Sequence, residues 1–390
     1  MEAQAQAESQ AHHPQRVIPI VARPEPADGA QRPAQARKGR GAVSNLIGRF
    51  ETQRSVAEDD GWYREDGEPP PLHTEVREER ARSLITRNTS PDVGFDRSIN
   101  PYRGCEHGCV YCYARPNHAY VGLSPGLDFE SRLFAKVNAP QLLARELCSP
   151  KYVPAPMAVG VVTDAYQPIE RQLRLTRGCL EVLERSRHPA QLITKSSLIE
   201  RDLDLLQPMA ARAQVLVNVS LTTLDHGLAR KMEPRCASPT RRLETIRRLS
   251  QAGVPVGVSV SPVIPFINEP EIEHILAAAY EAGARWAFHV VIRLPWEVEH
   301  LFRQWLETHY PQRTERVWAR IAEMRAGAGE GKINDARFGS RMTGEGVWAD
   351  LIHQRFAKAC ERLGYASEYP ALSVDGFVPP RPASAQGELF

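Results

Sequence analysis

From about residue 95 onward, short β-branched apolar runs alternate with longer amphipathic segments. The runs of strand length lie at 96–104, 157–163, 190–196, 214–223, 254–264 and 285–292. Between them, the helical spacing of apolar residues predicts helices over 168–186, 238–253 and 268–283. Repeated strand–helix–strand units favour a parallel sheet, and six strands are too few for a complete eight-unit barrel. The pattern therefore predicts an α/β fold, a partial (β/α)6 TIM-type barrel with one side open for a large substrate.

The segments outside the barrel have a different composition. Residues 1–40 are rich in Ala, Gln, Pro and Arg without periodicity, which predicts a disordered, basic and Pro-rich tail. The run "ARKGRGAVSNLIGRFE" at its end would lie on a partner, on nucleic acid or on the barrel itself. The predicted organisation is a tail over 1–40, an N-terminal extension over 41–94, the barrel over 95–295, a C-terminal helical extension over 296–370 and a flexible tail over 371–390.

Charge and cysteine usage narrow the class of protein. The chain has 49 basic and 47 acidic residues, so no global basic field indicates a nucleic-acid partner, and any such contact would be local. The polar, acidic N-terminus and the absence of an apolar stretch near 18 residues predict a cytoplasmic protein without a membrane span. Seven cysteines, three of them crowded together, are typical of a reducing compartment rather than of a disulfide framework.

The crowded cysteines are Cys105, Cys109 and Cys112, in "NPYRGCEHGCVYCYA" after the first predicted strand. A structural zinc site needs four ligands, and His107, so close in a short loop, would struggle to complete a tetrahedron with all three sulfurs. A redox pair formed by Cys109 and Cys112 would leave Cys105 unexplained. A four-iron cluster held by three thiolates accounts for all three, because its fourth iron stays open for a small-molecule ligand. The spacing therefore favours a metal centre at these three cysteines.

This spacing, with Tyr111 directly before Cys112, resembles the radical SAM superfamily. The order of "CVYCYA", "TDAYQPIE", "ITKS", "SLTT", "EPR" and "SPVIPFIN" over about residues 85–365 resembles its DNA-repair-photolyase-like branch, related to spore photoproduct lyase, and within it an uncharacterised bacterial subgroup. The resemblance implies a [4Fe-4S] cluster that binds S-adenosyl-L-methionine (SAM) and cleaves it reductively to a 5′-deoxyadenosyl radical. It further implies a flavodoxin- or ferredoxin-type electron donor and favours DNA or RNA as the substrate.

The same resemblance assigns SAM-binding residues at the ends of three predicted strands. Thr163 would lie near the amino group of SAM, and Lys195 and Ser220 would bind its polar groups. A lysine that ends an apolar strand must reach water or a carboxylate, and SAM supplies a carboxylate. A capping role is the alternative for the two hydroxyl residues.

Tyr111 and Tyr113 are similar in position to the tyrosines that relay a hydrogen atom in the lyase; packing around the cluster is the alternative. The lyase also has a cysteine near the end of the strand that reads "MAVGVVTDAY" in this chain, where Val161 stands and no thiol is present. This departure counts against spore photoproduct lyase activity. Cys236 is the candidate thiol for a replacement donor, although a free cysteine is more often inert.

Three further residues are candidates for contact with substrate. Glu233 and Arg235 in "KMEPRCASP" would form an ion pair with each other or bind substrate. Arg293, after the sixth strand, would point into the open mouth and bind an anionic group.

The last five residues, "QGELF", resemble the short peptides by which bacterial repair proteins dock on the replication sliding clamp. Gln386, Leu389 and Phe390 match that pattern, and Gly387 departs from it. The sequence as a whole predicts a radical SAM enzyme acting on an unknown substrate. A tRNA- or protein-modifying radical SAM enzyme and a non-catalytic, metal-stabilised protein that binds nucleic acid or the clamp remain the alternatives.

Overall fold

Six parallel strands form the main sheet, together with one antiparallel edge strand. A computed structural model describes residues 36–50, 72–329 and 332–380, all within a compact unit that spans Ala34–Phe390. The sheet order is β10-β9-β8-β7-β6-β3-β2, and every neighbouring pair is parallel except β2 with β3. The strands are β2 (Thr86–Arg87), β3 (Arg97–Ile99), β6 (Met157–Val159), β7 (Ala190–Thr194), β8 (Val215–Ser220), β9 (Val256–Val263) and β10 (Ala287–Val291). The predicted α/β class and the six-strand partial barrel are confirmed.

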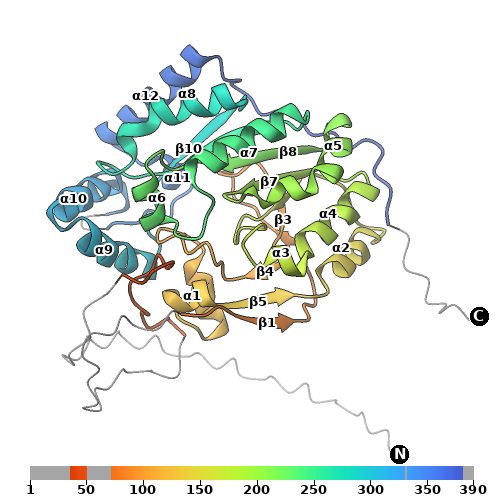
Figure 1. Cartoon of the computed structure of the whole chain (residues 1–390), viewed down its shortest axis with the longest axis horizontal. Coiled ribbons are helices and arrows are strands. Elements are labelled where there is room, and N and C mark those ends of the chain that lie inside the picture. Colours follow the sequence, from red (N-terminus) through yellow and green to blue (C-terminus); the bar gives the residue numbers. More distant parts are fainter. Residues whose placement is uncertain (1–35, 51–71, 330–331, 381–390) are drawn as a thin grey trace, which may run out of the picture. The chain divides into compact units, whose positions relative to one another are not determined.

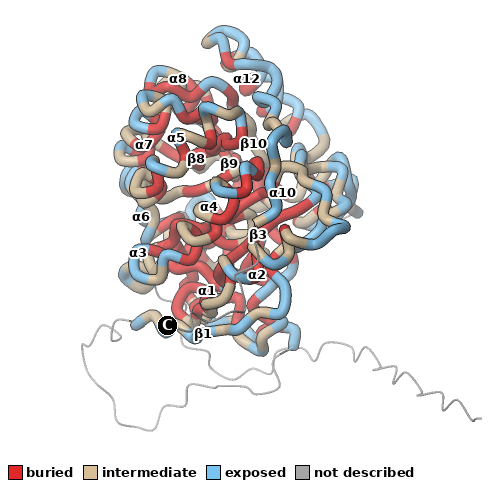
Figure 2. Tube along the Cα trace, turned by 90° about the vertical axis from the view of Figure 1, so that its right-hand side faces the viewer, coloured by how far each residue is buried: buried red, intermediate tan, exposed pale blue. Residues whose placement is uncertain are grey.

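A layer of helices follows the order of the strands (Figure 1). Its members are α2 (Ala139–Leu147), α4 (Leu175–Arg185), α5 (Leu203–Ala211), α7 (Pro239–Gln251) and α8 (Ile272–Ala282). Helix α2 contacts α4, α4 contacts α5, and α7 contacts α8. The β-branched residues of the strands and the apolar faces of these helices form the main hydrophobic core, and the strands β8 and β9 are largely red, meaning buried, in Figure 2.

The helix predicted over 168–186 is two helices in the structure, α3 (Glu170–Leu173) and α4. Arg174 between them has a φ of 52°, in the left-handed region, where a helix cannot continue. The buried Glu170 carboxylate accepts hydrogen bonds from the backbone N–H groups of Thr176 at 3.0 Å and Arg177 at 3.2 Å. A side chain of the first helix thus caps the second, which a periodicity argument does not predict.

A second, three-stranded sheet was not predicted. Its order is β1 (Glu75–Glu79), β5 (Arg132–Lys136) and β4 (Tyr102–Arg103). Strand β1 reads EVREE and is largely exposed, and β4 has two residues, so neither shows a hydrophobic pattern. Helix α1 (Leu127–Ser131) leads into β5, and β4 leads into the cysteine-containing segment. This small sheet therefore supports the candidate metal site from one side.

The predicted N-terminal tail can be assessed only from residue 36, because residues 1–35 lie outside the described part of the chain. Arg40, which the composition assigned to the tail, is buried and donates hydrogen bonds to the carbonyl oxygen of Glu130 at 2.7 Å and to Thr74 Oγ1 at 3.1 Å. The backbone N–H groups of Gly41 and Ala42 bind the Glu130 carboxylate at 3.0 and 2.8 Å. Residues 40–42 therefore pack on the barrel unit, one of the three alternatives that the sequence left open.

Helices follow β10 along the chain. They include α9 (Glu297–His309), α10 (Thr314–Met324), α11 (Ser340–Thr343) and α12 (Val347–Leu363). Phe302, Trp305 and Leu306 of α9 are fully buried, which agrees with a packing role for its aromatic residues. The remaining short helices are η1 (Arg115–Val121), η2 (Ser197–Asp202), α6 (His226–Met232), η3 (Glu269–Glu271), η4 (Pro311–Arg313) and η5 (Ala326–Ala328).

Residues 371–380, predicted as part of a flexible tail, are held against the barrel. The backbone N–H of Val378 binds the Ser186 carbonyl oxygen at 3.0 Å, and the ring of Phe377 lies 5.5 Å from the ring of His188. His188 is itself buried, with Nε2 2.7 Å from the Tyr152 hydroxyl. The Pro- and Ala-rich composition on which the tail was predicted did not show these long-range contacts. The clamp-like residues 386–390 lie outside the described residues.

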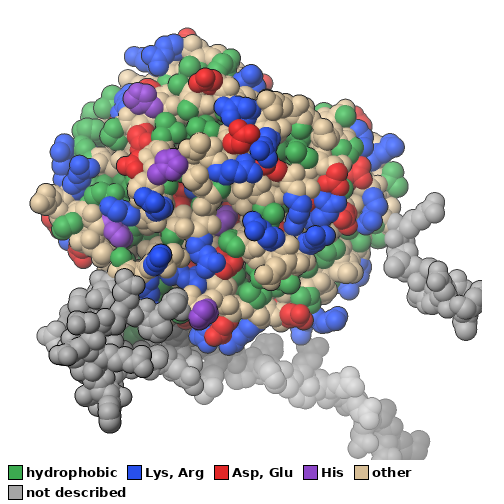
Figure 3. All heavy atoms as spheres, in the orientation of Figure 1, with side chains coloured by type: hydrophobic (Ala, Val, Ile, Leu, Met, Phe, Trp, Pro, Cys, Tyr) green, Lys and Arg blue, Asp and Glu red, His purple; other side chains and the backbone are tan. Residues whose placement is uncertain are grey.

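The surface carries interspersed positive and negative side chains on the face shown in Figure 3, as the near-neutral composition predicts. Over the residues that the structure describes, no helix is long and apolar enough to span a membrane.

Candidate metal centre

The loop that carries the three cysteines begins directly after β4 and fits tightly against its support. Gly104 has a φ of 73°, and a Cβ there would lie 2.8 Å from Leu133 Cδ2. Gly108 has a φ of 65°, and a Cβ there would lie 2.7 Å from Glu130 Oε2. Both positions therefore require glycine for backbone conformation and for space.

A fully buried arginine fixes the course of this loop. Arg115 donates hydrogen bonds from Nε to the carbonyl oxygen of Cys109 at 2.9 Å, and from its terminal nitrogens to those of Gly108 at 3.0 Å and Gly126 at 2.9 Å. It also forms an ion pair with Glu130, and both side chains are 0% exposed. Arg115 was not among the predicted site residues, because nothing in the sequence marks an arginine as buried.

The three thiols lie on the buried side of the loop. Cys105 is 6% and Cys109 is 7% exposed, and Cys112 is partly buried beside Val162. Among the described residues, no three His, Cys, Asp or Glu side chains converge as a site for a single ion. A four-iron cluster binds each thiolate through a different iron, so its ligands need not converge on one point. The donor set of three thiols on one buried loop therefore fits such a cluster better than it fits zinc.

The environments of two of these thiols are unequal. Cys109 Sγ lies 3.8 Å from Cys236 Sγ, and this contact lowers the pKa of Cys109 to about 7. Burial acts against this shift by raising the pKa, whereas the Lys195 ammonium group lowers it further. Burial, followed by the charges of Cys109 and Cys105, raises the pKa of Cys112 to about 12. A thiol such as Cys109 that ionises near neutral pH is suited to bind metal.

His107, the alternative fourth ligand, is engaged elsewhere. Its Nδ1 lies 3.2 Å from Asp164 Oδ2, within ion-pair distance although not aligned as a hydrogen bond. Burial alone would lower the pKa of His107, but the Asp164 carboxylate outweighs it and raises that pKa to about 10. Asp164 also accepts hydrogen bonds from Thr194 Oγ1 and the Lys195 backbone N–H, both at 2.8 Å. The contact ties the cysteine loop to the carboxyl end of β7.

The three residues assigned to SAM lie at the carboxyl edge of the main sheet. Ser220 is the last residue of β8, and Lys195 directly follows β7. Burial would lower the pKa of Lys195, yet the neighbouring Cys109 and Glu233 raise it, so its ammonium group stays charged. Lys195 Nζ lies 5.9 Å from the centre of the Tyr111 ring. Thr163 lies in the loop after β6 and already donates a hydrogen bond to the Tyr102 carbonyl oxygen at 3.3 Å.

Glu233 and Arg235 do not pair with each other, contrary to one of the two expectations for them. Glu233 is 2% exposed, accepts a hydrogen bond from the Tyr111 hydroxyl and forms an ion pair with Arg242, which is 1% exposed. Arg235 forms an ion pair with Glu106 at 3.3 Å instead. Residues two apart at the end of a helix point in different directions, so closeness in sequence did not give the partner.

Tyr113 and Arg293 lie on the open side of the site. Tyr113 is 51% exposed, and its hydroxyl donates a hydrogen bond to the carbonyl oxygen of Val161, the residue that stands where the resemblance expects a thiol. Arg293 follows β10; it contacts Met342 Sδ at 3.6 Å, and its buried Nε has no hydrogen-bond partner among the described residues. Burial lowers the pKa of Arg293. The structure thus brings the predicted cysteines, Tyr111, Lys195 and Glu233 together.

Comparisons with known proteins agree with this geometry. Residues 99–279 match the Radical SAM superfamily. An uncharacterised protein of Mycobacterium tuberculosis is 34% identical over 224 residues, which cover 57% of this chain and 66% of that protein. An uncharacterised protein of Methanocaldococcus jannaschii is 27% identical over 243 residues, covering 62% and 86%. A structure of spore photoproduct lyase complexed with dinucleoside spore photoproduct superposes with a TM-score of 0.53 and 14% identity over 74% of this chain and 80% of that one.

These comparisons define the fold and the superfamily of the barrel. The match over residues 99–279 begins at the last residue of β3 and includes the cysteine loop and the strands from β4 to β9. At 14% identity, the likeness to the lyase concerns the fold. The domain match is what implies a [4Fe-4S] cluster and SAM as cofactors, and the likeness to the lyase adds the fold.

Proposed function

Because this chain carries a radical SAM domain over residues 99–279, we propose that it is an enzyme that cleaves SAM reductively at a [4Fe-4S] cluster. The observation that carries the proposal is the set of three thiols on one buried loop, at the carboxyl edge of a parallel sheet, where this architecture collects its chemistry. When bound, the cluster supplies the electron that converts SAM to methionine and a 5′-deoxyadenosyl radical.

The residues of this chain have distinct roles in the proposal. Cys105, Cys109 and Cys112 hold the cluster, and Arg115 fixes the carbonyl groups of their loop from behind. In this proposal the ammonium group of Lys195, 5.9 Å from the centre of the Tyr111 ring, binds the carboxylate of SAM. Cys105 and Cys112 pack with Ala114, Phe129 and Val162, and this apolar contact limits the access of water to these two thiols, which would protect a radical from side reactions.

Nucleic acid is the substrate class that we favour, in the manner of a DNA-repair enzyme. Val161, in place of the thiol expected from the resemblance, makes the lyase reaction itself unsuitable for this chain. Tyr111 is bound to Glu233 in the interior, whereas Tyr113 is half-exposed at the mouth. The exposure of Tyr113 supports this residue, rather than Tyr111, as the one that exchanges a hydrogen atom with a substrate, and in the proposal Arg293 binds an anionic group of that substrate.

Anaerobic reconstitution with iron and sulfide tests the proposal. We expect about four irons per chain, the absorbance of an iron–sulfur cluster and dithionite-dependent release of 5′-deoxyadenosine from SAM. Cys105→Ala, Cys109→Ala and Cys112→Ala should each abolish SAM cleavage, and Cys148→Ala, a matched cysteine outside the loop, should not. Full iron content and SAM cleavage in Cys105→Ala would overturn the assignment.

The same reconstituted protein tests two further points: whether a protein serves as the electron donor, and whether the metal has only a structural role. Enzymes of this superfamily use electron donors, so flavodoxin or ferredoxin should replace dithionite in supporting SAM cleavage. If the reconstituted cluster binds but SAM is not cleaved with any reductant, the non-catalytic, metal-stabilised alternative gains support. Deuterium transfer into 5′-deoxyadenosine from labelled DNA, tRNA or protein would distinguish repair from modification of tRNA or protein.

A further inference from the structure

Residues 36–50, called here the N-terminal strip, are basic and lie directly on the cysteine loop. The strip contains Arg37, Lys38, Arg40 and Arg49 and no acidic residue. A Cβ on Gly41 would lie 1.9 Å from the carbonyl oxygen of Gly108, so the two backbones are in direct contact. The strip is therefore a fixed element beside the candidate metal centre; among its cations, Arg49 forms an ion pair with Glu297 at 2.9 Å.

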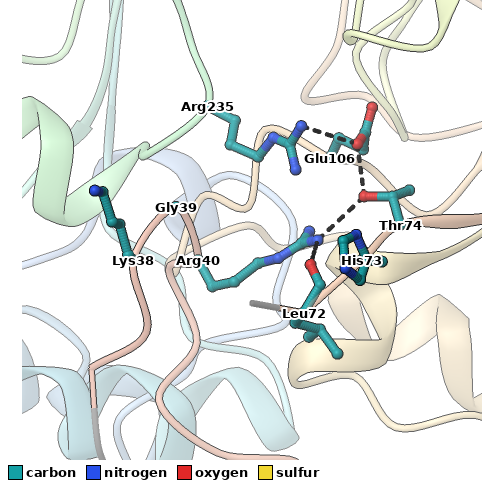
Figure 4. A pocket seen from close by; sticks show the side chains of 8 residues that line it. All are labelled: Lys38, Gly39, Arg40, Leu72, His73, Thr74, Glu106 and Arg235. Atoms are coloured by element: carbon teal, nitrogen blue, oxygen red, sulfur yellow. Dashed lines mark hydrogen bonds and ion pairs between the residues drawn. The ribbon is translucent and has the colours of Figure 1, made fainter. Parts of the chain in front are cut away.

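One part of the strip lines a basic pocket of about 360 Å³ (Figure 4). Lys38, Arg40 and Arg235 contribute three cations to its wall, whereas Glu106 is the one carboxylate among the eight lining residues. Glu106 already accepts a hydrogen bond from Thr74 Oγ1 at 2.6 Å and pairs with Arg235 at 3.3 Å. The pocket thus has an excess of positive charge and the size for a small anionic group, such as a phosphate.

The end of the strip carries an exposed aromatic cluster, called here the platform. Phe50, Tyr120 and Trp296 are 53%, 65% and 58% exposed. The rings of Phe50 and Tyr120 stack with their centres 5.3 Å apart at an interplanar angle of 30°. The Arg49 guanidinium carbon lies 4.0 Å from the centre of the Trp296 ring and 5.4 Å from that of Phe50. Three rings that would be costly to leave in water therefore surround one cation.

The backbone at Trp296 supports a functional reading of the platform. Trp296 has a φ of 49°, which is strained for a bulky residue, and its side chain is nevertheless more than half exposed. The strain is therefore not offset by burial of the ring. Strained residues of this kind cluster at ligand sites.

The platform also lies at the open side of the sheet. Tyr120 belongs to η1, which follows the cysteine loop, and Trp296 follows β10, the last parallel strand. Rings from segments that follow the first and the last parallel strands of the main sheet thus meet around Arg49. A large substrate that enters there would contact the platform.

We propose that the N-terminal strip and the platform bind single-stranded nucleic acid, with bases stacked on Phe50, Tyr120 and Trp296 and a backbone phosphate in the pocket beside Lys38 and Arg235. Cations that follow the phosphates and aromatic rings that stack on bases are the two elements of single-strand recognition. The chain as a whole is nearly neutral, with 49 basic and 47 acidic residues. The electrostatic attraction between protein and phosphates therefore has to come from the local strip. Only the role of the strand as substrate rests on the proposed function.

Binding of fluorescein-labelled single-stranded DNA and RNA to the reconstituted protein, followed by fluorescence anisotropy, tests the proposal. Tyr120→Ala and Trp296→Ala should each weaken binding at least about five-fold, the lower limit for losing one stacked base. Lys38→Glu should weaken binding and reduce the slope of log K against log salt by about 0.7 for the lost phosphate contact. Trp296→Phe should retain the affinity, because a phenyl ring still stacks.

Matched controls come from the amino-terminal side of the sheet. Tyr369 is 48% exposed and lies 6.0 Å from the Trp286 ring, and Lys151 is exposed before β6. Tyr369→Ala and Lys151→Glu should change the affinity less than two-fold, and circular dichroism shows whether each variant is folded.

Two results would overturn the proposal. One is that the folded variants Tyr120→Ala and Trp296→Ala bind the oligonucleotides with the same affinity as the unaltered chain. The other is that the same variants lose binding to an acidic protein, such as flavodoxin, while their affinity for the oligonucleotides is unchanged. That result would make the strip a protein-docking surface. Release of 5′-deoxyadenosine by the unaltered chain is a separate measurement, so strand binding without SAM cleavage would refute the proposed function and leave this inference standing.

Discussion

Replacing Arg115 by leucine gives the most direct test of how the cysteine loop is held. The substitution removes the hydrogen bonds to the carbonyl groups of Gly108 and Cys109 and the partner of the Glu130 carboxylate. Both charged side chains are 0% exposed, and removing one member of such a buried pair costs about 3–5 kcal/mol. Since about 1.4 kcal/mol is a factor of ten, the folding equilibrium constant should fall roughly 140- to 4,000-fold.

Urea unfolding of the metal-free protein, followed by circular dichroism, measures this loss, and iron analysis after reconstitution measures its effect on the loop. The control is Arg303→Leu, because Arg303 pairs with Glu315 at the surface, where the two side chains are 36% and 78% exposed. Such a pair contributes at most about 1 kcal/mol. If Arg115→Leu and Arg303→Leu lose the same stability and retain the same iron, the buried ion pair does not position the loop.

Three further predictions concern the same unit. Glu233→Gln leaves the buried Arg242 cation without its partner, so the urea midpoint should fall by the equivalent of about 3 kcal/mol; an unchanged midpoint would contradict this. Burial lowers the pKa of His188 from 6.5 to about 4. The stability that the neutral imidazole contributes is therefore fully present above pH 6.5 and is lost as the pH falls toward 4. Urea midpoints measured over this pH range should show the loss, and His188→Gln should diminish it. Gly108→Ala should reduce iron content, because its φ of 65° and the nearby Glu130 carboxylate both disfavour a side chain; full iron content would refute this.

The parallel sheet could be predicted because its signal is local. Continuous β-branched runs such as 214–223 are strands buried on both faces, and the alternation with helices gives their direction. The break at Arg174 could not be predicted, since it depends on the Glu170 carboxylate turning back to cap the next helix. Strand β4 has two residues and exists only because β5 pairs with it. Features that depend on distant partners left no periodic pattern.

The candidate site also combines features that could be predicted from local sequence with features that depend on distant partners. The three cysteines stand close in sequence, so their spacing alone indicated shared chemistry. The residues that fix the cysteine loop are not close in sequence to their partners. Arg115 pairs with Glu130, and Glu233 pairs with Arg242, only in the folded structure. A buried arginine has the same letter in the sequence as an exposed one, and only the tertiary structure distinguishes them.

The Glu130 carboxylate joins the cysteine loop to the N-terminal strip. It pairs with Arg115 on the loop side and accepts the backbone N–H groups of Gly41 and Ala42 on the strip side. Glu130→Gln keeps the size of the side chain, but it leaves the Arg115 cation unpaired and turns one acceptor oxygen into an NH₂ group that faces donors. We therefore expect a joint loss of iron content and of oligonucleotide affinity, measured by iron analysis and fluorescence anisotropy. Loss of iron with unchanged affinity would show that the strip is held independently of the loop.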